Sequence, residues 1–174
     1  MLSKNEHVLW KENFLQAMAQ TGEDGRATAD YIRSRGTVIG FKKVSRNVGA
    51  FWTLSKRIHL NSCHYSYTTP LTDPYMLSLL VHEVKHLQQG PFVALSVYGE
   101  LEAWQTGYRF YHQLSGYYPG GVIAEIMLLP FGWDRIILCR ARELMKLYAG
   151  KGYRVGRLPL YPINREIRYM FTGK

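Results

Sequence analysis

Apolar and polar residues follow two different periods along the chain, and the change between them comes near residue 37. Before it, the segment "NEHVLWKENFLQAMAQTG" repeats its apolar residues at helical spacing, which predicts an N-terminal helix ending at Gly22. A second, short helical stretch follows. After it, three segments are rich in β-branched and aromatic residues and are separated by polar turns: "TVIGFKKV", "VGAFWTLS" and "RIHLN". They predict two or three antiparallel strands.

Helical spacing returns beyond the predicted strands. Thr72 or Asp73 can cap the first of these helices, and Pro74 suits its first helical turn. This helix is expected to end near Gln89, where "GP" follows. Further helices are expected in residues 92–114, 122–129 and 134–148. The final residues, 151–174, contain two prolines and no clear period, so they predict a tail lying over the domain surface.

Composition indicates which partners and which cellular compartment suit the chain. The chain has 174 residues, with 22 Lys and Arg against 13 acidic residues, so the formal net charge is +9. That charge favours acidic partners such as nucleic acid, anionic lipid or acidic peptides. Cys63 and Cys139 lie far apart and form no metal clip, so reduced thiols are expected. The sequence has no signal-peptide pattern and no apolar run approaching the roughly 20 residues that span a bilayer, which favours a cytoplasmic location.

The stretch "LLVHEVKHLQQG" carries the strongest chemical pattern in the chain. His82 and His86 lie four residues apart on a predicted helix, so two neutral imidazoles on one face can ligate one metal ion. Glu83 can reach a metal-bound water without ligating the metal. The alternative is an amphipathic helix with polar residues on its exposed face. Leu79 on the histidine face, with a separate apolar stripe elsewhere, favours burial, and buried histidines need partners.

A catalytic zinc needs a third protein ligand and an open position. The segment "VYGELEAWQTGYRF" offers Glu100 and Glu102. By helical phase Glu100 shares a face of apolar and small residues, whereas Glu102 lies on a face that resembles a solvated surface, with Arg109 as its partner. We therefore expect Glu100 to be the ligand and keep Glu102 as an alternative. Gly99 and Gly107 inside this helix indicate close approach to the metal helix.

These residues carry a family resemblance. "HEVKH", followed fourteen residues after His86 by Glu100 within "ELEA", resembles the gluzincins, the thermolysin-like zinc metallopeptidases. More narrowly, it is similar to small bacterial gluzincin domains, in which the first glutamate of such an E-x-x-A pattern is the third ligand. The resemblance covers about residues 36–114. Lys85 and Trp104 depart from the family pattern, in which the first position is usually uncharged and the second is often an aspartate that orients a ligand histidine.

The resemblance implies an α+β, zincin-like fold. A small antiparallel β-sheet would pack on an active-site helix and a glutamate helix, with additional helices around them. We expect a single domain in four parts: an N-terminal helical segment (1–35), a zincin core (36–114), C-terminal helices (115–150) and the surface tail (151–174). An edge strand within residues 49–61 would pair with extended substrate.

The resemblance also implies an activity. It predicts a zinc-dependent metalloendopeptidase that binds Zn²⁺ through His82, His86 and Glu100 and hydrolyses peptide bonds through a zinc-activated water, with Glu83 as general base. The tail is expected to pack near the metal helix and limit access. The oligomeric state is not predicted, and no tyrosine is nominated to stabilise the oxyanion, although "GYYPGG" is suitably loop-like.

Two further alternatives stay open. His112 could replace Glu100 as third ligand, whereas His59, His64 and Cys63 are interpreted as ordinary polar positions. A different class of function is a catalytically weak or inactive metallopeptidase-like binding module, whose basic surface would bind nucleic acid or an acidic partner. Its tail alternates basic and aromatic residues, a pattern that can hold phosphates and stack bases: Lys151, Tyr153, Arg154, Arg157, Tyr161, Arg165, Arg168, Tyr169, Phe171 and Lys174.

Overall fold

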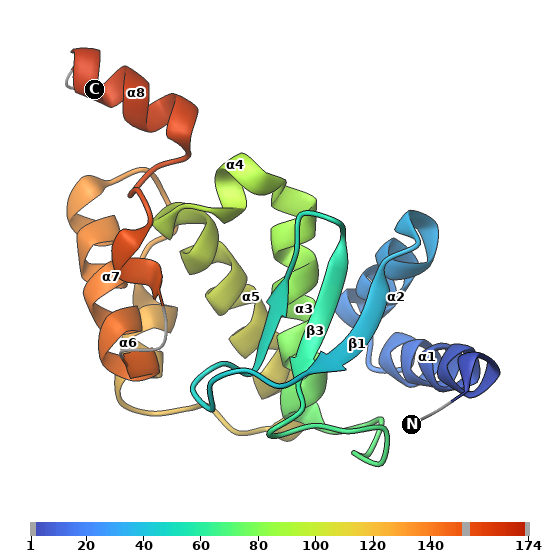
Figure 1. Cartoon of the computed structure of the whole chain (residues 1–174). Helices are drawn as coiled ribbons and strands as arrows, with labels where there is room; N and C mark the ends of the chain where they lie inside the picture. The colour runs from blue at the N-terminus through green and yellow to red at the C-terminus, as the bar shows by residue number, and fades with distance from the viewer. Residues whose placement is uncertain (1–2, 151–153, 173–174) are drawn as a thin grey trace.

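A computed structural model describes residues 3–150 and 154–172 of the chain. Its helices are α1 (Lys4–Ala19), α2 (Glu23–Arg35), α3 (Pro74–Gln89), α4 (Pro91–Ala94), α5 (Val97–Ser115), α6 (Val122–Leu128), α7 (Arg135–Ala149) and α8 (Ile163–Thr172), with a 3₁₀ turn, η2, at Arg154–Arg157. The strands are β1 (Val38–Lys42), β2 (Ala50–Trp52) and β3 (Arg57–Asn61). Figure 1 shows the sheet in front of α3, with α1 and α2 on one side and α6 and α7 on the other. The fold is therefore α+β and mostly helical, as the sequence predicted.

The three strands form one mixed sheet in the order β1-β3-β2. β2 and β3 pair antiparallel, with Phe51 opposite His59. β1 pairs parallel with β3, with Phe41 opposite Leu60, so the prediction of an antiparallel sheet is wrong at this pair. The loop of residues 43–49 explains the difference. It carries the chain past the position of β3, so β2 forms at the far edge and β3 returns between the other two strands.

Two clusters of buried apolar side chains lie on either side of the contact between α3 and α5. One is formed by α1, α2, the sheet and one face of α3, and Phe14 and Leu80 are fully buried in it. The other joins α5, α6, α7 and part of residues 155–161, around Leu101 and Leu138. α3 packs along α5 between the two clusters. This helix pair joins the two halves, and the expectation of one domain with the four predicted parts stays a prediction.

The start of α3 is set by its cap, as expected. Asp73 accepts a hydrogen bond from the backbone N–H of Met76 at 2.7 Å, and Pro74 occupies the first helical position. The helix expected over residues 92–114 is instead two helices, because Ser96 caps a new one. Its hydroxyl accepts from the backbone N–H of Gly99 at 3.0 Å, and the chain leaves helical geometry at Leu95. α5 can therefore turn to run along α3.

Glycines on α5 permit close contacts on two different sides. A Cβ on Gly107 would lie 3.2 Å from both Cβ of His82 and the carbonyl oxygen of Ser78, so the expected approach to the metal helix is confirmed there. Gly99 is close to α4 instead, where a Cβ would lie 2.1 Å from the carbonyl oxygen of Val93. The two glycines thus position α5 against α3 and against the turn that precedes it.

The C-terminal segment is more ordered than its sequence pattern indicated, because residues 163–172 form α8. Leu160 and Tyr161 are buried, and the backbone N–H groups of Val97 and Tyr98 donate to carbonyls of residues 159 and 160. α8 contacts α4 and extends beyond α7 in Figure 1. Its apolar residues Met170 and Phe171 are 76% and 85% exposed. The tail therefore docks through the residues before α8 and through Tyr169 of α8, which packs against the second cluster, while Met170 and Phe171 stay exposed.

None of the helices in the described part of the chain combines the length and hydropathy needed to cross a bilayer. Cys63 and Cys139 are both free and exposed, as expected for reduced thiols.

We predict that Gly99→Ala destabilises the fold. Its Cβ would collide with the backbone of Val93, and backbone cannot move aside as a flexible side chain can. Overpacking of this kind costs about 1–3 kcal/mol of unfolding free energy, measured by urea denaturation. Gly120→Ala is the control, because no atom lies within 4 Å of the Cβ it would add. Equal stability of the two variants would contradict the close contact at Gly99.

Candidate metal centre

Three predicted ligands from two helices meet at the α3–α5 contact. His82 and His86 come from α3 and Glu100 comes from the first turn of α5. The Nε2 atoms of the two histidines lie 3.1 Å apart, and Glu100 carboxylate oxygens lie 4.0 Å from Nε2 of His82 and 3.7 Å from Nε2 of His86. Within the described residues this is the group of His, Cys, Asp and Glu side chains whose donor atoms are close enough to share a metal ion.

The donor set fits zinc. A tetrahedral zinc ion with bonds of about 2.1 Å places its ligand atoms about 3.4 Å apart, close to the separations seen here. Two imidazole nitrogens and one carboxylate are a ligand set of catalytic zinc sites that leave a fourth position open. The group therefore has the composition and spacing to hold a metal ion, and zinc itself stays a prediction.

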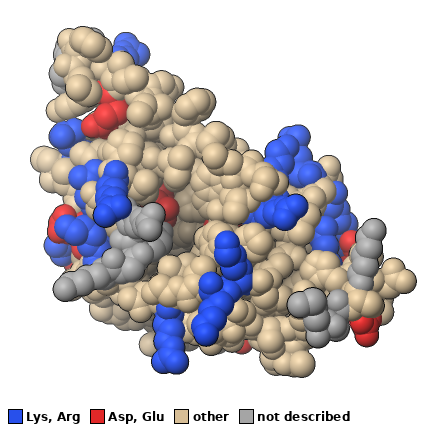
Figure 2. Space-filling model, in the orientation of Figure 1, with Lys and Arg blue, Asp and Glu red and all other residues tan. Residues whose placement is uncertain are grey.

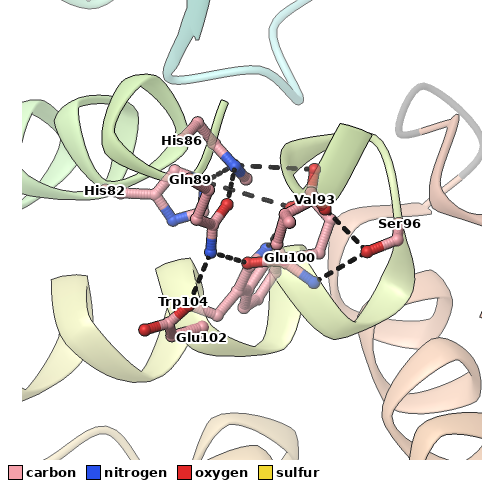
Figure 3. A network of polar contacts seen from close by, with 9 residues as sticks. His82, His86, Gln89, Val93, Ser96, Glu100, Glu102 and Trp104 are labelled. Carbon is pink, nitrogen blue, oxygen red and sulfur yellow. Dashed lines mark hydrogen bonds and ion pairs between the residues drawn. The ribbon is translucent and has the colours of Figure 1, made fainter. Parts of the chain in front are cut away.

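The neighbours of His86 fix which of its nitrogens carries the proton (Figure 3). Nδ1 of His86 lies 3.2 Å from Oε1 of Gln89. Nε2 of Gln89 donates to the carbonyl of Gly99 and to the carboxylate of Glu102, each at 2.9 Å. Because the amide nitrogen of Gln89 is committed to these acceptors, its oxygen must face His86, and Nδ1 of His86 must be the donor. This leaves the lone pair of Nε2 pointing at His82 and Glu100.

His82 is held in a similar way. Its ring donates to the backbone carbonyl of Ala103 on α5. Burial, and next the charge of His86, hold the pKa of His82 well below its usual value, so this imidazole is neutral and able to ligate a metal. Hydrogen bonding of the remote ring nitrogen is the common way in which proteins orient ligating histidines.

Glu102 is occupied elsewhere. One of its oxygens pairs with Nζ of Lys85 at 2.7 Å and the other accepts from Gln89. The expectation that Arg109 is the partner of Glu102 was wrong, because Lys85 on α3 reaches across the helix contact. The face predicted to be solvated is also partly buried, since Gln105 donates to the carbonyls of Ile126 and Leu129. The structure thus brings Glu100 to the histidines and pairs Glu102 with the lysine that departed from the family pattern.

Trp104, the second departure, also contacts the site. Its indole Nε1 donates to Oε2 of Glu100 at 3.2 Å, one helical turn away. The ring lies edge-on to His82, with centroids 6.4 Å apart. Trp104 therefore orients the carboxylate instead of a histidine, a role that sequence reasoning missed, although the i, i+4 spacing to Glu100 was a usable signal.

Glu83 is buried and accepts a hydrogen bond from the backbone N–H of Trp52 on β2. Burial, followed by the charge of Glu100, raises the pKa of Glu83 well above its usual value. A carboxyl group with a raised pKa beside an open cavity is suited to take and return protons. The edge strand β2 therefore both covers the helix and positions the predicted base.

A cavity of about 810 Å³ opens beside His82 and Glu83. One wall comes from β2 and the loop of residues 43–49, and the opposite wall comes from α5 and the end of α7. Its volume is in the range of ligand-binding pockets. The two residues expected to ligate and to act as base thus reach a space that a substrate can enter.

Three of the four tyrosines that line the same cavity form a hydrogen-bonded group that was not singled out by sequence. The hydroxyl of Tyr108 donates to that of Tyr148 at 3.1 Å, and the hydroxyl of Tyr75 lies within 3.5 Å of both. Burial raises the pKa of Tyr75 to about 12 and raises that of Tyr108 further. Both phenols are therefore neutral donors at physiological pH. The tyrosines come from α3, α5 and α7, and not from the "GYYPGG" loop that was suggested.

The other candidate residues lie outside the metal centre. His112 lies in the last turn of α5 against Tyr118 and is not part of the donor group found among the described residues. His59 packs against the ring of Phe51 in the sheet, with the two rings tilted by 30°. His64 and Cys63 line the cavity. No tail residue from the described range 154–172 lines the cavity, so the predicted lid is not supported there, and Lys151, Tyr153 and Lys174 lie outside the described residues.

No family model, curated protein or solved structure matches this chain. The geometry of the site therefore carries the functional argument.

We predict that Gln89→Leu weakens zinc binding about 10–100-fold, because it removes the acceptor that orients His86. Affinity would be measured by competition with a chromophoric chelator. Gln88→Leu is the matched control, since Gln88 is the exposed neighbour on the same helix. If the two variants bind zinc equally, Gln89 does not orient the ligand.

We predict that Glu100→Gln protein loses most of its zinc, whereas Glu102→Gln protein keeps it. Only Glu100 presents its carboxylate to both histidines, and Glu102 pairs with Lys85. Elemental analysis of protein purified without added metal would give the ratio of zinc to chain. Loss of zinc from the Glu102 variant alone would reverse the assignment.

Proposed function

We propose that this chain is a zinc-dependent metallopeptidase of the gluzincin type. The observation that carries the proposal is the meeting of His82, His86 and Glu100 at one point, with Glu83 on the wall of the adjoining cavity. Two ligands and a base from one helical turn, completed by a glutamate from a second helix, match the H-E-x-x-H…E pattern in space as well as in sequence.

Zinc bound by these three side chains would supply a Lewis acid that polarises the scissile carbonyl and acidifies water. The chain supplies the proton transfers. Glu83 takes a proton from the attacking water and passes it to the leaving amine, for which a raised pKa is favourable. The backbone N–H of Trp52 holds the Glu83 carboxylate in place between these two transfers.

The edge strand β2 offers backbone groups to an extended peptide. Gly49 and Thr53 bond with β3 through Asn61 and Arg57. Because bonding alternates along an antiparallel strand, the backbone groups of Ala50 and Trp52 point away from β3. The N–H of Trp52 is taken by Glu83, so the backbone of Ala50 and the carbonyl of Trp52 are the groups offered to a peptide. A peptide lying there would add a strand to the sheet and place its scissile bond over the metal centre.

The tyrosine group supports the same chemistry. Neutral phenols are hydrogen-bond donors, and donors that face a developing oxyanion lower the barrier of acyl transfer. Tyr75, Tyr108 and Tyr148 line the cavity that Glu83 reaches, which makes them the candidates for this contact. A cytoplasmic location remains part of the proposal.

The second candidate is the inactive binding module with a basic surface. The observation in its favour is the charge of +9 together with exposed Lys43 and Arg46 beside the cavity. The intact Glu83 argues against it, because a module that only binds has no use for a buried carboxylate beside the ligands.

We predict that Glu83→Gln retains the fold and zinc but lowers kcat/KM by about 10²–10⁴-fold, since the base is lost and the ligands remain. Cleavage of a quenched fluorescent peptide library by the zinc-loaded protein is the assay, with zinc content and circular dichroism measured in parallel. Near-normal cleavage by the variant would exclude Glu83 as base. An unmodified protein that binds zinc and cleaves no peptide would favour the binding module.

A further inference from the structure

We infer that the cavity beside the metal centre selects acidic peptide segments, and that the loop of residues 43–49 is the element that recognises them. The inference rests on the proposed function and deepens it, because it names the class of substrate.

The charges around the cavity are unbalanced. Among its lining residues Glu83 is the one carboxylate, and it is buried at the metal centre. Arg46 lies on the wall, and a smaller adjoining cavity is lined by Lys43, Arg46, Ser62, Cys63 and His64. A peptide that enters the cavity therefore meets cations where it passes the loop. Among the described residues that line the two cavities, no exposed side chain is acidic.

Lys43 and Arg46 are available for a ligand. Both side chains are exposed, and neither forms an ion pair with any described residue. Elsewhere Arg33, Lys85, Arg140 and Lys146 are paired with carboxylates of their own. The two cations beside the cavity are therefore not neutralised by a described carboxylate and can pair with an acidic ligand.

The loop that carries them is fixed by buried Asn61 of β3. Nδ2 of Asn61 donates to the carbonyls of Ser45 and Val48 at 2.9 and 2.7 Å, and its Oδ1 accepts from the backbone N–H of Val44 at 3.3 Å. Asn61 has no exposed surface. A buried amide satisfied on both sides holds its partners in one conformation, so the loop is prepared for binding before a ligand arrives.

His64 and Cys63 add to this support from the other side of the loop. Nε2 of His64 lies 2.7 Å from the carbonyl oxygen of Arg46, and Sγ of Cys63 lies 3.6 Å from that of Val44. Arg46 is thus held through its backbone while its guanidinium stays free to meet a carboxylate. The "SCHY" segment, which sequence reasoning gave no role, positions the cation.

The wider surface has the same sign. Figure 2 shows Lys and Arg side chains around the hollow on this face, and few acidic side chains beside them. Such a field draws acidic chains toward a cleft and raises their rate of association. We favour a peptide over nucleic acid as the ligand. The open edge of β2 lies next to the loop, and its backbone groups can form hydrogen bonds with the backbone of a peptide.

The test uses the full chain with Glu83→Gln and zinc bound, so that peptides bind without being cut. Three fluorescein-labelled peptides share one uncharged core and carry Asp, Asn or Lys flanks, and their Kd values are measured by anisotropy at low and high salt. We expect the Asp peptide to bind at least about tenfold more tightly than the Asn peptide at low salt, and to lose this advantage at high salt. The Lys peptide is expected to bind most weakly.

Charge reversal then locates the recognition. Arg46→Glu and Lys43→Glu are expected to abolish the preference for the Asp peptide and to strengthen binding of the Lys peptide. Arg26→Glu makes the same change in net charge on α2, outside both cavities, and is expected to leave the preference intact. Equal Kd values for the three peptides, or an equal effect of Arg26→Glu, would overturn the inference. So would a single-stranded oligonucleotide that binds more tightly than the Asp peptide and depends on Arg46.

The outcome is separable from the proposed function, because binding is measured in a variant in which cleavage is expected to be too slow to deplete the peptide. Preference for the Asp peptide without cleavage of it by the unmodified protein would retain this inference and reject the peptidase. Cleavage of all three peptides with equal kcat/KM would retain the peptidase and reject the acidic preference.

Discussion

The close packing of α3 on α5 is the constraint on which the rest of the site depends. Gly107 has no side chain where α5 passes His82, and this lets the two helices approach closely enough for Glu100 to face the histidines. Several contacts that orient the candidate ligands cross this helix pair: Gln89 to Gly99, His82 to Ala103, and the carboxylate of Glu100 to both imidazoles. A small change in helix separation would disturb all of them together.

The charged residues near the metal centre follow from the same contact. Lys85, which departs from the family pattern, satisfies Glu102, and Glu102 in turn holds Gln89 toward His86. A partly buried carboxylate without a cation would destabilise the fold. The ion pair with Lys85 offsets this cost and lets a second glutamate lie close to the ligands. Trp104 supplies a neutral donor to Glu100 and leaves the negative charge of that carboxylate intact for a metal.

Sequence reasoning predicted the parts that depend on local periodicity. The spacing of His82 and His86, the cap at Asp73 and the helical phase of Glu100 all depend on residues within a few turns of one another. It failed where distant segments meet. The parallel β1–β3 pair, the salt bridge of Lys85 and the tyrosines from three helices depend on how the chain returns on itself, which no local pattern encodes. The break between α4 and α5 was not predicted, although it depends on a local signal, because Ser96 is a residue type that caps helices.

The electrostatics of the buried centre give an independent argument for a cation. Burial, and next the charge of Glu100, disfavour ionisation of Glu83. A divalent cation between His82, His86 and Glu100 would offset that repulsion and favour the charged form of Glu83. The exposed cations of the loop cannot do so, because they lie at the surface, where water screens them. In the proposed function the two sets of charge have separate tasks: Glu100 would share a metal with the histidines, and the surface bases would meet an acidic chain.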